Sequence, residues 1–233
     1  MAIVKALWVV RRGSSALAVK ASPDEREAVL DRVGAIDPVA GPFLGPVAAT
    51  NWLRLFGSYT RSPDGTLTGR VISGNAKTKW AATGPVLPLG LDDLEHAVTV
   101  GADGGIAMWH AHGARYGRVP DAHARAAAVD RGLVVVMRSD RARIDVRQLS
   151  GRRIASWAIA SGAAPLLDAD AGTAVYSAGR AVHEIALATG TDHVVATAPH
   201  GTTLVDAQIE RRLVAYAYRG ASDPDGRVVV LPR

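Results

Sequence analysis

The sequence contains no cysteine, which excludes disulfide bonds and thiolate metal sites. It has no uninterrupted apolar stretch near the roughly 18 residues that a membrane-spanning helix needs. Aromatic residues make up only 5% of the 233 residues, so a core has to be filled by Val, Ile, Leu and Ala. A chain of this length can bury such a core in one domain.

Lysine is also scarce, with 4 residues against 23 arginines, and the net charge is +5. The arginines are scattered along the chain rather than gathered in a run. A composition rich in Arg, Ala and Val and poor in Lys is typical of a genome with high GC content, which accounts for much of the charge. Nucleic-acid binding is therefore disfavoured, and membrane insertion is not expected.

The N-terminal residues 1–10 are apolar apart from Lys5, and Arg11 and Arg12 follow them. A signal peptide has its positive charge before the apolar run, so we interpret this stretch as a strand. At face value this indicates a cytoplasmic protein. A start within a longer parent chain would instead allow an envelope or secreted location.

Turn glycines recur at an almost constant spacing. Gly74, Gly113, Gly151 and Gly190 each follow a Ser, His or Thr, at steps of 39, 38 and 39 residues. A period near 40 with several short strands per unit is typical of a β-propeller. We expect these glycines to adopt positive φ, because they occupy one fixed place in each hairpin.

The fold class expected is all-β: a single β-propeller domain over residues 1–233, with about five blades of three to four antiparallel strands. The units cover residues 47–82, 86–119, 124–160, 166–198 and 203–231. The apolar runs 133–136 and 228–231 predict strands that are buried on both faces. Trp80 and Trp157, two periods apart, are expected to pack between blades.

Residues 22–45 break the period and are predicted to form a helix and loop insertion. Ser22 can cap a helix, Pro23 suits its first turn and Glu25 completes a capping box, so a helix is expected over 22–33. The last unit has only three strands. We expect an N-terminal strand to pair with residues 228–231 and complete a shared blade, unless the ring is N-terminally incomplete.

Turns of the type Ser62-Pro63-Asp64-Gly65, with a related turn at residues 222–226, occur in phase with the propeller period. With these turns the chain resembles degenerate bacterial propeller repeat proteins of the WD40-like or TolB-like kind. The resemblance implies a binding or assembly scaffold, often in the bacterial envelope, and it implies no catalytic residues.

Two pairs of residues are candidates for a site. Asp168 and Asp206 occupy equivalent places in first strands, which line the channel of a propeller, so they could bind a ligand or could satisfy backbone amides. His110 and His112 alternate on one strand and could be two ligands of a metal, with His123 or Asp121 as a third. The structural interpretation, a histidine pair within a strand, is favoured over the metal site.

Six arginines crowd one unit and could form a basic edge for an acidic partner, although ion-paired surface is the favoured interpretation: Arg138, Arg141, Arg143, Arg147, Arg152 and Arg153. Phosphate loops, a nucleophile elbow, a dinucleotide fingerprint and a zinc-helix motif are absent, so no cofactor is expected. The leading hypothesis is a noncatalytic scaffold that binds a protein or a small ligand. The alternative is a propeller enzyme, a metal-assisted hydrolase or lactonase-like activity at the channel mouth.

Overall fold

The computed structural model describes the backbone of most of the chain and, from residue 90 onward, most side chains. The described residues are 8–12, 15–21, 28–32, 35–39, 43–49, 54–61, 67–73, 81–83, 86–92, 94, 96–101, 105–110, 115–119, 124–138, 142–210, 213–221 and 226–233. Every regular element within them is a β-strand. Over these residues, no helix is both long enough and apolar enough to cross a membrane.

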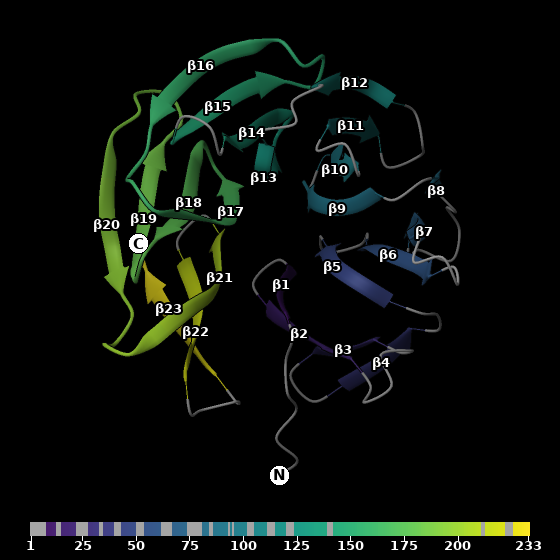
Figure 1. Ribbon diagram of the computed structural model, residues 1–233, viewed down its shortest axis with the longest axis horizontal. Helices are drawn as coiled ribbons and strands as arrows, with labels where there is room; N and C mark the ends of the chain where they lie inside the picture. The colour runs from purple at the N-terminus through teal and green to yellow at the C-terminus, as the bar shows by residue number, and fades with distance from the viewer. Residues whose placement is uncertain are drawn as a thin grey trace.

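The described strands form six antiparallel sheets, each made from consecutive strands (Figure 1). The first sheet holds β1 (Trp8–Arg12), β2 (Ser15–Ala21), β3 (Ala28–Arg32) and β4 (Ala35–Val39). The second holds β5 (Phe43–Ala49), β6 (Arg54–Arg61), β7 (Leu67–Ser73) and β8 (Ala81–Thr83). The third holds β9 (Val86–Leu91), β10 (His96–Gly101), β11 (Ile106–His110) and β12 (Arg115–Val119).

The remaining three sheets follow the same scheme. The fourth holds β13 (Ala124–Asp130), β14 (Leu133–Arg138), β15 (Arg143–Gln148) and β16 (Arg153–Ala158). The fifth holds β17 (Ala163–Asp170), β18 (Thr173–Ala178), β19 (Ala181–Ala186) and β20 (Asp192–Thr197). The sixth holds β21 (Thr202–Glu210), β22 (Leu213–Gly220) and β23 (Arg227–Pro232).

The first strand of each sheet lies beside the first strand of the next, and β1 lies beside β21. The sheets are therefore arranged around a ring with these strands innermost, as Figure 1 shows. This arrangement confirms the expected fold class, an all-β propeller. The described strands form six sheets, one more than the count of about five.

The extra sheet comes from the stretch where we expected a helical insertion. Residues 28–32 and 35–39 are β3 and β4; β3 pairs with both β2 and β4. The first six residues of the expected helix, 22–27, lie outside the described residues. Strand pairing outweighs the capping signals here because Val29 and Leu30 extend the sheet begun by β1 and β2.

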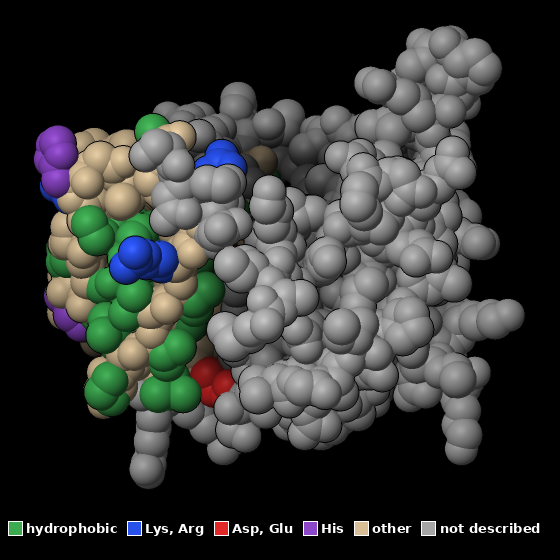
Figure 2. Space-filling view, turned by 90° about the horizontal axis from the view of Figure 1, so that it is seen from below, with side chains coloured by type: hydrophobic (Ala, Val, Ile, Leu, Met, Phe, Trp, Pro, Cys, Tyr) green, Lys and Arg blue, Asp and Glu red, His purple; other side chains and the backbone are tan. Residues whose placement is uncertain are grey.

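The prediction that an N-terminal strand pairs with residues 228–231 in a shared blade is wrong for the described strands. β1 and β2 belong to the first sheet, and β23 pairs with β22 alone among the described strands, while residues 3–7 lie outside the description. The run 228–231 is not buried on both faces, since Val228 and Val230 are 51% and 53% exposed. Hydrophobic side chains occupy much of the described part of the face in Figure 2.

The described core lies between neighbouring sheets. On β14, Val134 and Val136 pack against the third sheet, while Val135 and Met137 pack against the fifth. All four are buried, which confirms the prediction for Val134, Val135 and Val136, while Leu133 is partly buried. The strand has no polar face because sheets cover it on both sides.

Carboxylates of one sheet accept hydrogen bonds from amides of the next. Asp92 accepts from the Gly132 amide at 3.0 Å, Asp130 from the Gly172 amide at 2.9 Å, and Asp168 from the Ile209 amide at 2.9 Å. The separations along the chain are 40, 42 and 41 residues. These inter-sheet links follow the repeat period.

The turn glycines that the structure describes confirm the expectation of positive φ. Gly151 has φ 91° and Gly190 has φ 73°, while Gly74 and Gly113 lie outside the described residues. Trp157 on β16 packs between sheets as expected, since its Nε1 donates to the Leu187 carbonyl at 2.9 Å. A Cβ added to Gly190 would lie 2.4 Å from the indole of Trp157. Trp80 lies outside the described residues.

Replacing Gly190 by alanine should lower the free energy of unfolding by about 2 to 3 kcal/mol. The alanine would be held in the left-handed backbone region, and its Cβ would overpack against the indole of Trp157. Gly172→Ala is the matched control, because Gly172 has φ 77° and no atom within 4 Å of an added Cβ. Chemical denaturation should show that the control loses only about 1 kcal/mol of unfolding free energy, because it carries the backbone strain alone. Equal losses in the two variants would contradict the contact with Trp157.

Candidate functional site

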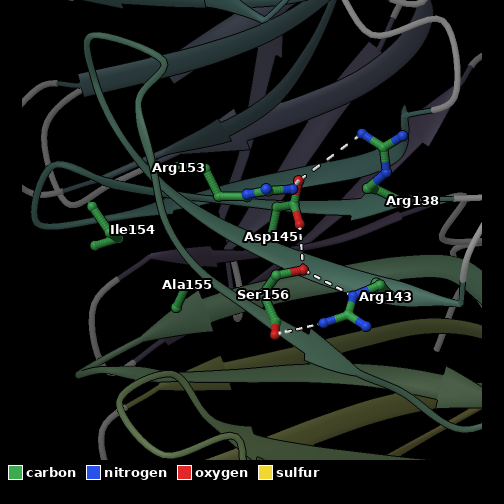
Figure 3. A pocket seen from close by; sticks show the side chains of 7 residues that line it. All are labelled: Arg138, Arg143, Asp145, Arg153, Ile154, Ala155 and Ser156. Carbon is green, nitrogen blue, oxygen red and sulfur yellow. Dashed lines mark hydrogen bonds and ion pairs between the residues drawn. The ribbon is translucent and has the colours of Figure 1, made fainter.

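A pocket of about 460 Å³ opens on the fourth sheet, over its outer strands (Figure 3). It is lined by three arginines, one carboxylate and small side chains: Arg138, Arg143, Asp145, Arg153, Ile154, Ala155 and Ser156. These residues come from β14, β15 and β16, or from their ends. Three adjacent strands therefore supply its charged groups.

Strand pairing brings the charged residues to one face. Asp145 lies opposite both Val136 on β14 and Ser156 on β16, and Arg138 lies opposite Arg143. Residues directly opposite each other in a sheet share a face, and alternate residues along a strand do so too. Val136 packs against the third sheet, so the charged cluster extends outward from that interface.

Asp145 is at the centre of the cluster and has no exposed surface. Its Oδ2 lies 2.8 Å from Nη2 of Arg147, 3.9 Å from Nη1 of Arg153 and 4.0 Å from Nη1 of Arg138. Its Oδ1 accepts a hydrogen bond from Ser156 Oγ at 2.7 Å. A buried carboxylate of this kind is stable because it is ion-paired and hydrogen-bonded.

Arg143 is held in place without a carboxylate. Its Nε donates to Ser156 Oγ and its Nη2 donates to the Ser156 carbonyl, both at 2.9 Å, as Figure 3 shows. These two hydrogen bonds fix the planar guanidinium group of Arg143. Both acceptor oxygens are neutral, so they do not cancel its positive charge. Arg153, in contrast, is 56% exposed, and its only described partner is the distant Asp145.

Among the described residues the cluster holds one carboxylate, that of Asp145, and four guanidinium groups. Those of Arg138, Arg147 and Arg153 lie within 4.0 Å of Asp145, and Arg143 is joined to it through Ser156. Arg147 makes the close pair with Asp145 and does not line the pocket. Arginines from three strands line this concave surface, an arrangement that can bind an anion.

For these arginines the favoured interpretation was ion-paired surface, and the alternative was a basic edge for an acidic partner. The structure brings four of the six together, while Arg152 bonds to Gln148 and Arg141 lies outside the described residues. The signal that could have found them is the spacing of Arg143, Asp145 and Arg147, which puts all three on one face of a strand. The contribution of Arg138 and Arg153 depends on register, which the sequence alone does not fix.

The structure places Asp168 on β17 and Asp206 on β21, two innermost strands that lie side by side. Asp168 accepts from the Ile209 amide, and Asp206 accepts from its neighbour Ala207 at 2.9 Å and from Gln208 Nε2 at 3.1 Å. Both carboxylates are half-buried. Each carboxylate therefore accepts a hydrogen bond from a backbone amide, and its role as a ligand-binding residue stays a prediction.

His110 ends β11, and His112 lies outside the described residues, as do His123 and Asp121. The cross-strand neighbour of His110 is His96 on β10, and the Nδ1 of His96 lies 2.8 Å from Asp92 Oδ2. The two imidazoles pack around Tyr116, with ring centroids 5.7 and 6.1 Å away. Within the described residues, no three His, Asp or Glu side chains gather as metal ligands.

A second polar cluster surrounds Tyr176, which is fully buried on β18. Its hydroxyl donates to Asp192 Oδ2 at 2.5 Å and accepts from the Ala160 amide at 3.0 Å, and its ring stacks on His183. Burial raises the pKa of Tyr176 well above its ordinary value, so the phenol stays protonated. The cluster joins the fourth and fifth sheets.

No family model matches the sequence, and no curated protein matches it. Among solved structures the chain is similar to Hsv2p from Kluyveromyces lactis, with 12% identity and a TM-score of 0.60 over 96% of this chain and 74% of that one. It is also similar to BamB from Moraxella catarrhalis, with 15% identity and a TM-score of 0.52 over 97% and 69%. The computationally designed Ika8 protein gives 13% identity and a TM-score of 0.56 over 98% and 83%.

Hsv2p and BamB are β-propellers, so the comparisons agree with the ring of sheets described above. At these identities the similarity shows the fold alone. The protein is thus defined as a β-propeller, and any function has to be argued from its own side chains.

Proposed function

We propose that this propeller is a noncatalytic scaffold that binds an anionic partner, a protein or a small ligand, through the arginine pocket of the fourth sheet. The observation that supports it is a pocket lined by arginines from three adjacent strands. Among the described residues, Arg147 makes the close pair with the buried carboxylate of Asp145 and does not line the pocket. Arg143 and Arg153 line the pocket without making that close pair.

No contact of the described residues favours the hydrolase or lactonase-like alternative. Asp168 and Asp206 each accept a hydrogen bond from a backbone amide. A general acid or base has to reach a substrate within a pocket. Asp206 lines a cavity of about 10 Å³, which has room for little more than a water molecule, and the larger arginine pocket lies on the outer strands of the fourth sheet.

A short, labelled glutamate-rich peptide should bind the wild-type protein, with fluorescence anisotropy as the measurement. The double change Arg143→Gln, Arg153→Gln should weaken binding by about tenfold or more, because charge-assisted hydrogen bonds are lost. Arg219→Gln, Arg227→Gln is the control, since both residues are exposed on the sixth sheet and the net charge falls equally. Equal weakening by both pairs would mean that net charge, and not the pocket, attracts the peptide.

A further inference from the structure

We infer that the outer edge of β23 binds a single extended segment of another polypeptide, which completes the sixth sheet as its fourth strand. The segment runs antiparallel to β23, is uncharged and carries β-branched side chains. The surface belongs to a different sheet from the arginine pocket, and the inference does not depend on that pocket.

The sixth sheet is one strand short of its neighbours. It has three described strands, whereas each of the other five sheets has four. Among the described strands β23 pairs only with β22, so it is the outermost strand of its sheet. The sheets on either side, the fifth and the first, end in β20 and β4 (Figure 1). In the described part of the chain, the place beside β23 is therefore a recess one strand wide.

β23 is exposed where the third strands of other sheets are buried. Val228 and Val230 are 51% and 53% exposed, whereas Ile144 on β15 and Ile185 on β19 have no exposed surface. The run 228–231 carries no charge, and its pairing with β22 has no register shift. Native sheets usually protect an exposed edge with charges or bulges. An apolar and regular edge is instead suited to the addition of a strand.

The backbone of β23 presents hydrogen-bonding groups to this recess. Pro232 has no N–H, and a strand tolerates proline where that group would face away from the paired strand. The N–H and C=O of one residue face the same side, and the side alternates along an antiparallel strand. The amides of Val228 and Val230 therefore face the recess, while those of Val229 and Leu231 face β22.

The recess favours a single segment over the edge of a second folded copy. A strand added beside β23 lies about 4.8 Å further from the axis, level with β20. In a dimer joined edge to edge through β23, the outer strand β20 of each copy would occupy the row that β19 of the other copy already fills. A lone strand avoids this overlap, because it brings no neighbouring sheets with it.

The surroundings of the recess define the side chains of the segment. Val195 and Ala196 of β20 pack against the apolar cluster between the fifth and sixth sheets, and Val229 packs against the same cluster. Residues opposite each other on adjacent strands share a face, so segment residues opposite Val229 meet these apolar atoms. Those opposite Val228 and Val230 extend the row of exposed valines. A charged side chain would lose water there without gaining a partner, whereas β-branched residues suit both faces.

Amide hydrogen exchange, followed by NMR on the full chain, tests the inference residue by residue. In the protein alone, the amides of Val228 and Val230 should exchange at least about tenfold faster than those of Val229 and Leu231. The probe is a peptide of about seven residues in which threonine and valine alternate. It should slow exchange at Val228 and Val230 and leave Val229 and Leu231 within about twofold.

Two N-methylated versions of the peptide are matched in composition. Each carries its methyl groups on one alternate set of backbone amides. One set faces β23, so that version should bind at least about tenfold more weakly than the parent, because its donors are lost. The other set points away, so that version should stay within about threefold. Equal weakening of the two versions would contradict strand addition.

Val230→Pro and Val230→Thr form a matched pair of protein variants. Val230→Pro removes an amide that faces the recess and should weaken peptide binding at least about tenfold. Val230→Thr keeps that amide and the β-branched shape, so it should stay within about threefold. If Val230→Pro does not fold, the two N-methylated peptides decide the question on the wild-type protein.

Three results would overturn the inference. The first is the absence of peptide binding. The second is slow exchange at Val228 and Val230 in the protein alone, because the edge would then already be covered by other residues of the chain. The third is a dimer that forms with rising concentration in analytical ultracentrifugation and dissociates when the peptide is added, which would assign the edge to a second copy.

Discussion

Asp145→Asn should lower the free energy of unfolding by about 3 to 5 kcal/mol, the range found when one partner of a buried ion pair is removed. Asp145 has no exposed surface, and its Oδ2 lies 2.8 Å from Arg147 Nη2. Asparagine keeps the shape but removes the negative charge, which lies within 4.0 Å of three guanidinium groups. Urea denaturation at constant ionic strength measures the loss.

The control is the double change Asp145→Asn, Arg147→Met, which removes the close pair together. It should be less destabilised than the single variant, because the guanidinium that lies closest to residue 145 is removed together with its charge partner. Sulfate should also raise the melting temperature of Asp145→Asn more than that of wild type, since an anion would supply the missing charge. A single variant within half a kcal/mol of wild type would contradict the central role of Asp145.

Arg233→Met should destabilise the protein by about 3 kcal/mol. The Nε and Nη2 of Arg233 donate to the two carboxylate oxygens of Glu184, and its Nη2 also donates to Thr173 Oγ1 at 3.0 Å. Glu184 is 7% exposed, so the variant leaves a buried carboxylate without its closest positive charge. Thermal unfolding followed by circular dichroism gives the change.

Arg227→Met, at the start of β23, the strand that Arg233 follows, should change stability by less than about 0.5 kcal/mol, because Arg227 is exposed. Glu184→Leu combined with Arg233→Met should recover part of the loss, because no unpaired carboxylate remains. A loss for Arg233→Met no larger than that for Arg227→Met would show that the pair does not join the fifth and sixth sheets.

The repeat period predicted the fold. Each hairpin turn needs a residue that tolerates positive φ, and glycine recurs at these turns. The first sheet was missed for a physical reason. Capping residues such as Ser22 and Glu25 describe what an isolated segment prefers, while β2 offers residues 28–32 a ladder of hydrogen bonds. The number of sheets therefore depended on strand pairing in the folded protein, which local sequence signals do not show.

The arginine pocket was predicted only as a list of residues. Alternation along β15 places Arg143, Asp145 and Arg147 together, but Arg138 and Arg153 join them through the registers of β14 and β16. A slip of one residue in either pairing would move those side chains to the opposite face. Asp168 was assigned to an innermost strand from the repeat alone, whereas its bond to the Ile209 amide required the neighbouring sheet.

The inter-sheet links from Asp92, Asp130 and Asp168 bear on how such a chain can evolve. Each link joins residues 40 to 42 positions apart, so one unit carries a carboxylate for its successor and an amide for its predecessor. A gene duplication that inserted one whole unit in frame would supply both halves of every new junction. The number of units could then change by recombination without new contacts having to arise by point mutation, because each interface depends only on its two neighbours.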